Sequence, residues 1–157
     1  IISQIESLET IADSYGLELN HIKAHGALYN QMIIDAELSN FYLDTIKDFK
    51  NKCSLYIPYK SEIEKIALKK GFSIIYEVFG DRNYNDDISL VSRNNENALI
   101  TDPESVVNHI KTIKETETVK TINGKYKKIK FDTICIHSDT NNSIEILKKI
   151  NQEFDES

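Results

Sequence analysis

The hydrophobic positions of this chain follow two different periods. In five segments apolar residues recur every three or four positions, which predicts helices over residues 1–15, 38–49, 61–70, 102–113 and 144–150. Between them stand short apolar runs typical of buried strands, at residues 19–23, 54–57, 72–76 and 133–136. The pattern therefore predicts strands that alternate with helices.

Residues with strong cap preferences mark several helix ends. Gly16 and Gly71 follow two of the helical patterns, and glycine is common just beyond a helix C-terminus. Ser39 is a candidate N-cap for the second helix. Asp102 followed by Pro103 is a stronger signal, because aspartate caps a helix and proline fits its first position.

Two segments depart from this alternation. Residues 118–131 alternate polar and apolar side chains around Asn123-Gly124, which is typical of a β-hairpin. Residues 80–97 are polar and have the composition of a long loop. We expect the hairpin at 118–131 to be inserted into the main architecture.

Strands that alternate with helices predict an α/β fold with a parallel sheet. The chain has 157 residues, which suits a single domain over 1–157. An eight-unit (β/α) barrel typically needs about 250 residues. The alternatives are a small open sheet or the C-terminal part of a barrel that lacks its N-terminal strands. A chain that starts with a helix and no Met favours the barrel fragment.

Composition narrows the function classes. The net charge is −6 and the only basic run is residues 125–130, so a nucleic-acid partner is not expected. No segment reaches the roughly 18 apolar residues of a membrane span, and no signal peptide is visible. Cys53 and Cys135 lie far apart in apolar runs. We expect free thiols in a cytoplasmic protein.

Charged and imidazole side chains gather where the predicted strands end. Lys23 and His25 close the first strand and would share one face of it if the strand stays extended. The other strand ends carry Tyr59, Lys60, Glu77, Asp81, Arg82, His137 and Asp139. In parallel α/β architectures this C-terminal edge is where sites are built. The sequence therefore predicts a site at this edge.

Each of these residues also has a structural interpretation. A lone histidine at a strand end is more often hydrogen-bonded structure than catalyst. Asp81 and Arg82 can form a loop ion pair of little energetic value, and Lys60 fits a solvated helix start. His21 and His109 have no comparable charged neighbours in sequence and are predicted to be structural or at the surface.

The sequence contains little evidence for a metal site or a nucleotide site. His25, His137, Glu77 and Asp139 are residue types that can bind zinc or another divalent ion, but no spacing such as His-Glu-x-x-His is present. Whether a metal is bound is left open. The chain also has no glycine-rich phosphate loop.

Three long motifs resemble those of the LamB/YcsF family. Residues 22–30, IKAHGALYN, resemble its VKPHGALYN motif. Residues 77–87, EVFGDRNYNDD, resemble EVFADRAYTDDG, and residues 90–93, LVSR, continue that match. Residues 134–140, ICIHSDT, resemble ICVHGDTP. The order and spacing agree along essentially the whole chain.

This chain departs from the family motifs at a few positions. Ala24 stands where the family has Pro, Gly80 where it has Ala, and Ile88 where it has Gly. Ser138 replaces Gly and Asn141 replaces Pro. The family's N-terminal motifs NCDLGE, HAGDP and AHPGYPD are absent from this chain. The resemblance therefore implies a C-terminal fragment that is inactive alone if those motifs help form the site.

The resemblance implies a distorted (β/α) barrel of the glycoside hydrolase and deacetylase kind. It also implies an enzyme, a 5-oxoprolinase component that opens 5-oxo-L-proline to L-glutamate with ATP as co-substrate. Subunits B and C of 5-oxoprolinase would be its partners and would handle the nucleotide.

On this interpretation, two groups of residues form the site. The expected catalytic groups are His25, His137, Glu77, Asp81 and Asp139. The expected substrate contacts are Lys23, Arg82, Tyr29 and Asn30. The histidines would transfer protons near neutral pH, and the two cationic side chains would hold an oxyanion.

Two other functions are compatible with the same residues. One is a metal-dependent hydrolase of sugar amides or esters, as kinship with deacetylases would allow. The other is a non-catalytic module that binds a carbohydrate or another small molecule.

Overall fold

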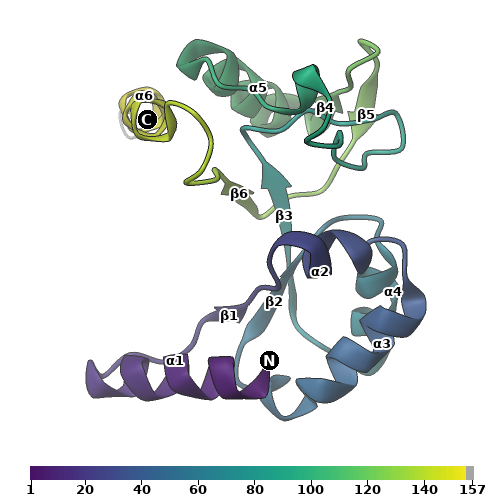
Figure 1. The fold of residues 1–157 in the computed structure, drawn as a ribbon, viewed down its shortest axis with the longest axis vertical. Coiled ribbons are helices and arrows are strands. Elements are labelled where there is room, and N and C mark those ends of the chain that lie inside the picture. Colours follow the sequence, from purple (N-terminus) through teal and green to yellow (C-terminus); the bar gives the residue numbers. More distant parts are fainter. Residues whose placement is uncertain (155–157) are drawn as a thin grey trace. The chain divides into compact units, whose positions relative to one another are not determined.

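A computed structural model describes residues 1–154 of the chain (Figure 1). The chain divides into two compact units, residues 1–77 (unit 1) and residues 78–157 (unit 2). Each unit is described by itself. The expectation of one domain over 1–157 stays a prediction.

The sheet of unit 1 is parallel, as the alternation of strands and helices predicts. It consists of β1 (His21–Ile22), β2 (Ser54–Ile57) and the first part of β3 (Ile74–Phe79). Leu55 of β2 pairs with Ile22 on one side and with Ile74 on the other. β3 runs three residues further than the predicted strand at 72–76, so Glu77 lies within a strand and not after it.

The helices of unit 1 are α1 (Ile2–Ser14), α2 (Gly26–Gln31), α3 (Ala36–Thr45) and α4 (Glu62–Lys70), with a 3₁₀ turn, η1 (Lys47–Phe49). The predicted cap of α3 is wrong. Asp35 caps it by accepting from Leu38 N at 2.9 Å, whereas Ser39 lies inside the helix and donates to the carbonyl of Met32. Ser61 caps α4, and Gly71 ends it with a left-handed backbone.

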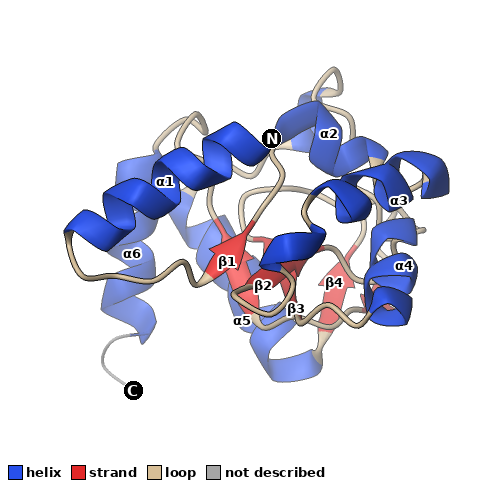
Figure 2. Ribbon diagram, turned by 90° about the horizontal axis from the view of Figure 1, so that it is seen from below, coloured by secondary structure: helices blue, strands red, loops and turns tan. Residues whose placement is uncertain are grey.

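The core of unit 1 forms where α3 and α4 pack against each other and against the sheet (Figure 2). Leu43, Ile46 and Ala67 are fully buried there, with Leu55 from β2. The predicted apolar face of α1 is used only in part. Ile5 packs against this cluster, whereas other apolar positions of α1, Leu8 and Ile11, are 54% and 57% exposed.

Unit 2 continues from the end of β3. Its other elements are η2 (Glu96–Ala98), α5 (Pro103–Thr116), β4 (Thr118–Lys120), β5 (Tyr126–Lys128), β6 (Thr133–Cys135) and α6 (Ser143–Phe154). β6 neighbours β3 in the sheet, and just beyond β3 Gly80 N donates to the Cys135 carbonyl at 3.0 Å. α5 packs against α6 and β4 around Val106, Ile110 and Ile146.

The caps and the hairpin region of unit 2 follow from local sequence. Asp102 caps α5 by accepting from Ser105 N at 2.8 Å. β4 and β5 pair antiparallel, with Val119 opposite Lys127, and Gly124 takes a positive φ in the turn between them. Whether this pair is an insertion in a barrel stays a prediction.

Two smaller expectations can be compared directly with the structure. Cys53 and Cys135 are both free thiols, the first buried and the second half-buried. Across residues 1–154, no helix combines the length and the apolar character that crossing a membrane requires.

Gly80 is the most tightly enclosed glycine of the chain. A Cβ at this position would lie 2.8 Å from Ile136 Cδ1 and 3.0 Å from Ile110 Cδ1. Both contacts are below the usual van der Waals separation. A larger residue at position 80 is therefore disfavoured by lack of space, because the terminal methyl groups of Ile136 and Ile110 occupy the room that a Cβ would need.

We predict that Gly80→Ala destabilises the chain by about 1–3 kcal/mol through overpacking, and that Ile136→Val relieves part of this cost. Removing Cδ1 of Ile136 alone should cost about 0.5–1.5 kcal/mol. The double variant should be more stable than the sum of the single effects by roughly 0.5–3 kcal/mol. Urea unfolding of the four proteins measures this coupling.

Ile134→Val is the matched control, because Ile134 packs on the same cluster but supplies none of the three atoms nearest to the Cβ position of Gly80. Its effect should add to that of Gly80→Ala. If Gly80→Ala showed the same coupling energy with Ile134→Val as with Ile136→Val, the packing argument would be wrong.

Candidate functional site

The predicted site residues fall into two groups, one in each unit. Unit 1 holds Lys23, His25, Tyr29, Asn30 and Glu77. Unit 2 holds Asp81, Arg82, His137 and Asp139.

Asp81 is the centre of the group in unit 2. Its side chain is fully buried directly after β3 and Gly80. It accepts hydrogen bonds from the backbone N of His137 at 2.9 Å and from Thr140 Oγ1 at 2.5 Å. Nδ1 of His137 lies 3.0 Å from its Oδ1. One carboxylate therefore binds both ends of the segment that follows β6.

The pKa of Asp81 reflects this arrangement. Burial alone would raise the pKa of its carboxyl group, but the hydrogen bonds from the His137 ring, the Thr140 hydroxyl and the His137 backbone outweigh burial, and the pKa is lowered. Asp81 is therefore a charged carboxylate at neutral pH, although it is removed from water.

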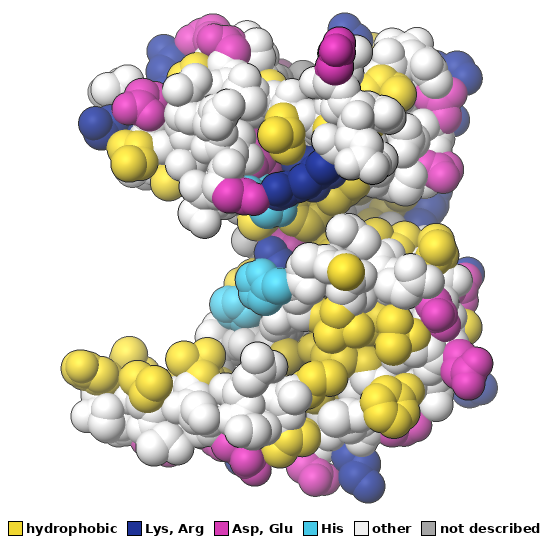
Figure 3. All heavy atoms as spheres, viewed as in Figure 1, with side chains coloured by type: hydrophobic (Ala, Val, Ile, Leu, Met, Phe, Trp, Pro, Cys, Tyr) yellow, Lys and Arg dark blue, Asp and Glu magenta, His cyan; other side chains and the backbone are white. Residues whose placement is uncertain are grey.

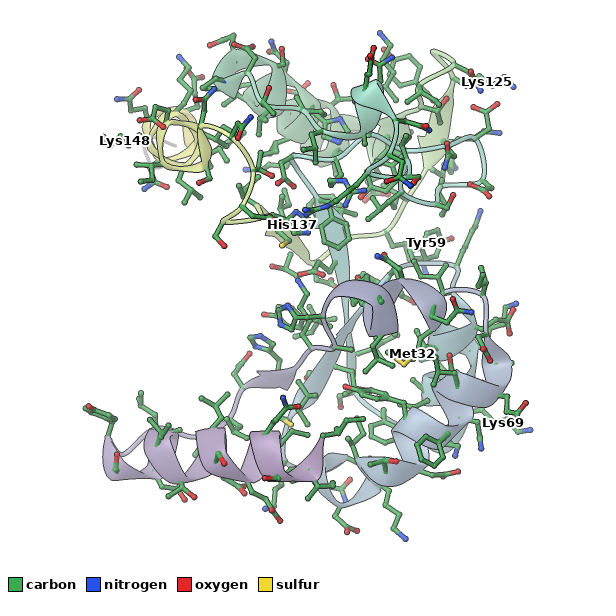
Figure 4. The ribbon with its side chains drawn as sticks, viewed as in Figure 1. Met32, Tyr59, Lys69, Lys125, His137 and Lys148 are labelled. Carbon is green, nitrogen blue, oxygen red and sulfur yellow. The ribbon has the colours of Figure 1, made fainter. Side chains whose placement is uncertain are left out.

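Asp81 also determines the proton positions on His137. Because a carboxylate can only accept, the proton of a neutral His137 ring is assigned to Nδ1, and Nε2 is left as an acceptor. Within residues 1–154 no hydrogen bond to Nε2 is formed, and the side chain is 25% exposed. The ring stacks on Phe79 at 5.1 Å between centroids, which fixes its plane (Figure 4). His137 thus presents an oriented, solvent-accessible nitrogen.

Arg82, a predicted substrate contact, is buried and bound to backbone. Its Nη2 donates to the Val91 carbonyl at 2.7 Å and its Nε to the Ala98 carbonyl at 3.3 Å. These bonds tie the loop after β3 to η2. The geometry favours a structural role for Arg82, and its contact with substrate stays a prediction.

Asp139 is exposed and paired with Arg93, a residue that sequence reasoning did not single out. Arg93 Nη1 donates to Asp139 Oδ2 at 2.6 Å and Nη2 to Oδ1 at 3.3 Å. The side chains are 45% and 62% exposed. Hydrogen bonding from Arg93 lowers the pKa of Asp139, with a smaller contribution from the charge of His137. Membership of Arg93 in the LVSR match was the only sequence signal for it.

The hairpin of β4 and β5 supports the loop that follows Arg82. Thr121 Oγ1 donates to Asp86 at 2.7 Å, and Lys125 forms an ion pair with the same carboxylate at 2.6 Å. The bond from Lys125 is the largest of the causes that lower the pKa of Asp86 to about 2. Tyr84, in the same loop, accepts from Phe79 N at 2.9 Å. The loop is therefore bonded to the hairpin through Asp86 and to the end of β3 through Tyr84.

In unit 1, Lys23 and Glu77 form a buried ion pair. Lys23 Nζ lies 2.5 Å from Glu77 Oε1, with side-chain exposures of 14% and 3%. The second oxygen, Oε2, is buried and accepts no hydrogen bond within the described residues 1–154. Such an atom is costly unless a ligand or water satisfies it. This oxygen is the best indication of a binding function in unit 1.

The remaining predicted residues of unit 1 differ in exposure. β1 ends at Ile22, so the strand alternation expected to align Lys23 with His25 does not apply. His25 is exposed at the N-cap position of α2. On α2, Tyr29 is buried and Asn30 is exposed.

His21 was predicted to be structural or at the surface, and it is exposed in the structure. It stacks on Tyr56 at 3.7 Å between centroids. Burial lowers the pKa of His21, the charge of Glu77 opposes this, and Lys23 and His25 lower it further. His21 therefore lies in the electrostatic field of the Lys23–Glu77 pair, an arrangement that its place in the sequence did not reveal.

No group of three His, Cys, Asp or Glu side chains suited to hold a metal ion occurs among residues 1–154. The sequence left metal binding open. The described part of the chain does bring together a buried carboxylate, Asp81, and the ring of His137.

Comparisons with known proteins agree with the motifs. The family model described as "LamB/YcsF family" matches residues 1–157. A protein of Pyrococcus abyssi, named as the A subunit of 5-oxoprolinase, is 36% identical over 156 residues, which are 99% of this chain and 61% of the relative. A protein of the same name from Campylobacter jejuni is 40% identical over 152 residues, or 96% of this chain and 59% of the relative.

A solved structure is also similar. The crystal structure of a "Lactam Utilization Protein" from Thermus thermophilus superposes with a TM-score of 0.88 and 27% sequence identity, over 98% of this chain and 61% of that one. The chain thus spans about three-fifths of the length of the relatives that it matches. Because the family model covers every residue, this chain belongs to the LamB/YcsF family.

Proposed function

We propose that this chain is part of the A component of 5-oxoprolinase, which hydrolyses 5-oxo-L-proline to L-glutamate with ATP as co-substrate and with partner subunits B and C. The names of the relatives support the activity, and the word "subunit" in those names supports partners. The oriented Asp81–His137 pair is the observation in this chain that carries the proposal. A cytoplasmic location is part of the same proposal.

The proposed architecture is part of a distorted (β/α) barrel, a single domain over 1–157 with the hairpin at 118–131 inserted. The parallel sheet and the similarity to the Thermus protein support this view. The residues that complete the barrel would lie in the remaining two-fifths of the relatives' length.

The chemistry requires a proton acceptor. A five-membered lactam is a stabilised amide, and phosphorylation of its oxygen by ATP would supply a leaving group. Water would then add to the ring carbon and pass its proton to His137 Nε2. The C–N bond of the ring would break as the leaving nitrogen takes up a proton, and hydrolysis of the acyl phosphate so formed would give L-glutamate and phosphate. Asp81 would stabilise the resulting imidazolium, since it is charged and bonded to Nδ1. Asp81 is in this account a positioning residue and His137 the catalytic one.

The other predicted residues keep proposed roles of their own. Lys23 would bind an oxyanion. Glu77 is paired with Lys23 and would activate water or orient a histidine through Oε2, which accepts no hydrogen bond among residues 1–154. His25 would be a further proton-transfer group, with Tyr29 and Asn30 as substrate contacts. ATP would be handled with the partner subunits, and a divalent metal stays an open possibility.

We predict that His137→Gln lowers kcat by about 10²–10⁴-fold, because the proton acceptor is lost. Asp81→Asn should lower kcat at least about tenfold with little change in KM, because the ring loses its charged partner. The measurement is 5-oxo-L-proline-dependent ATP hydrolysis by the protein that contains this chain, assembled with its partner subunits. Full activity of His137→Gln would show that the assigned role is wrong.

Thr140 gives a separate prediction about stability. Thr140→Val removes a hydrogen bond to Asp81, so the pKa of Asp81 should rise toward the unfolded value of about 3.9. The free energy of unfolding should fall by about 1–3 kcal/mol at pH 7. A lowered pKa stabilises the fold above the unfolded pKa, and this contribution disappears as the pH falls through the folded pKa.

The two proteins should therefore differ less at pH 2 than at pH 7 in urea unfolding. Thr140→Ser keeps the hydroxyl group and serves as the control, with a smaller loss at pH 7. A loss that is independent of pH would contradict the link between Thr140 and the Asp81 charge.

A further inference from the structure

The two arginines of unit 2 are in opposite environments. The guanidinium of Arg82 is buried, and its hydrogen bonds go to the Val91 and Ala98 carbonyls. The guanidinium of Arg93 is 45% exposed, and both of its Nη atoms face the carboxylate of Asp139. Of the two arginines, only Arg93 uses both Nη atoms (its fork) to hold a carboxylate, and that carboxylate, on Asp139, is also exposed to solvent.

The backbone before Arg93 is anchored. Val91 is 1% exposed, its N donates to the Asn83 carbonyl at 3.0 Å, and its carbonyl accepts from Arg82. A turn follows, in which Asn95 N donates to the Ser92 carbonyl at 2.9 Å. Arg93 therefore extends from a fixed point, which reduces the freedom that it would lose on binding a ligand.

Arg93 also lies in the electrostatic environment of the Asp81–His137 pair. The pKa of Arg93 is raised first by its hydrogen bond to Asp139, and the charge of Asp81 adds to the effect. Asp139 is two residues from His137 and feels its charge. In Figure 3, Lys or Arg atoms lie beside acidic and histidine atoms on this face of unit 2.

We propose that Arg93 binds the carboxylate group of 5-oxo-L-proline with the same two donors that now hold Asp139, and that Asp139 is a displaceable occupant of this fork. The inference rests on the proposed function, and it assigns the carboxylate contact to Arg93 instead of Arg82. It also gives Asp139 a role in gating this contact in place of proton transfer.

The exchange costs little, and the ligand can add contacts that Asp139 does not make. An exposed ion pair contributes little to stability, so Asp139 can leave the fork and be solvated at small cost. A ligand carboxylate can accept from the same two donors, so the exchange of one carboxylate for the other is close to neutral in its polar contacts. The ligand gains from its lactam ring as well, whereas Asp139 offers the carboxylate alone. Net charge at the fork is unchanged by the exchange.

The experiment measures binding to the whole protein that contains this chain, by titration calorimetry and by the NMR shift of the Arg93 Nε–H group. The probes are 5-oxo-L-proline, 2-pyrrolidinone, which lacks the carboxylate, and acetate, which lacks the lactam. Arg93→Gln should weaken 5-oxo-L-proline binding at least about tenfold. Asp139→Asn should strengthen it roughly twofold to fivefold, because the competitor is removed.

Lys149→Gln is the matched control for net charge, since Lys149 pairs with Glu104 and Glu153 in the same unit. It should bind all three probes as the parent chain does, and 2-pyrrolidinone should not respond to Arg93→Gln. Weaker binding of 5-oxo-L-proline by Asp139→Asn would overturn the proposal.

The outcomes separate this proposal from the proposed function. If acetate binds through Arg93 and 5-oxo-L-proline binds no better, the carboxylate site stands and the lactam substrate is wrong. If 5-oxo-L-proline binds equally well to the parent chain and to Arg93→Gln, the substrate stands and the Arg93 assignment is wrong. Absence of any carboxylate effect on Arg93 at high concentration would also overturn it.

Discussion

The buried charge of Asp81 organises the second unit of this protein. A carboxylate without water is tolerated only where donors replace the lost solvation. Here the donors are the backbone and ring of His137 and the hydroxyl of Thr140. These bonds hold the segment after β6 against the loop after β3. The same contacts orient the His137 ring, so stability and the proposed chemistry depend on one interaction.

The loop after Asp81 shows how such an interaction is supported from further away. Arg82 ties the loop to the carbonyls of Val91 and Ala98, and the β4–β5 hairpin binds Asp86. Ile88, which stands where the family motif has glycine, has a φ of +65°. A β-branched residue is strained in that region. The contacts of the hairpin and of Arg82 therefore stabilise a loop in which the backbone at Ile88 is strained.

The sequence predicted the order of strands and helices because hydrophobic periodicity reports which face of an element is buried. It missed α2, which is too short to show a period, and it placed the α3 cap at Ser39 instead of Asp35. The predicted strand ends directed attention to Asp81 and His137, and the structure shows that their side chains lie within hydrogen-bond distance.

Other parts of the site could not be predicted in this way. Thr140 and Arg93 act through contacts with residues 59 and 46 positions away. Periodicity carries no information about contacts at that range. The burial of Arg82 could not be predicted either, because its partners are backbone carbonyls, which every residue type carries.

The close fit at Gly80 bears on how sequences of this family are compared. The family motifs have Ala at this position and Val at the position of Ile136, so this chain has one methyl group less at the first and one more at the second. The added methyl, Cδ1, lies 2.8 Å from where the lost one would be. In this chain the two differences from the motifs therefore offset each other in volume. A position-by-position alignment would count them as independent divergence, whereas covariation between the two sites would recognise a single exchange.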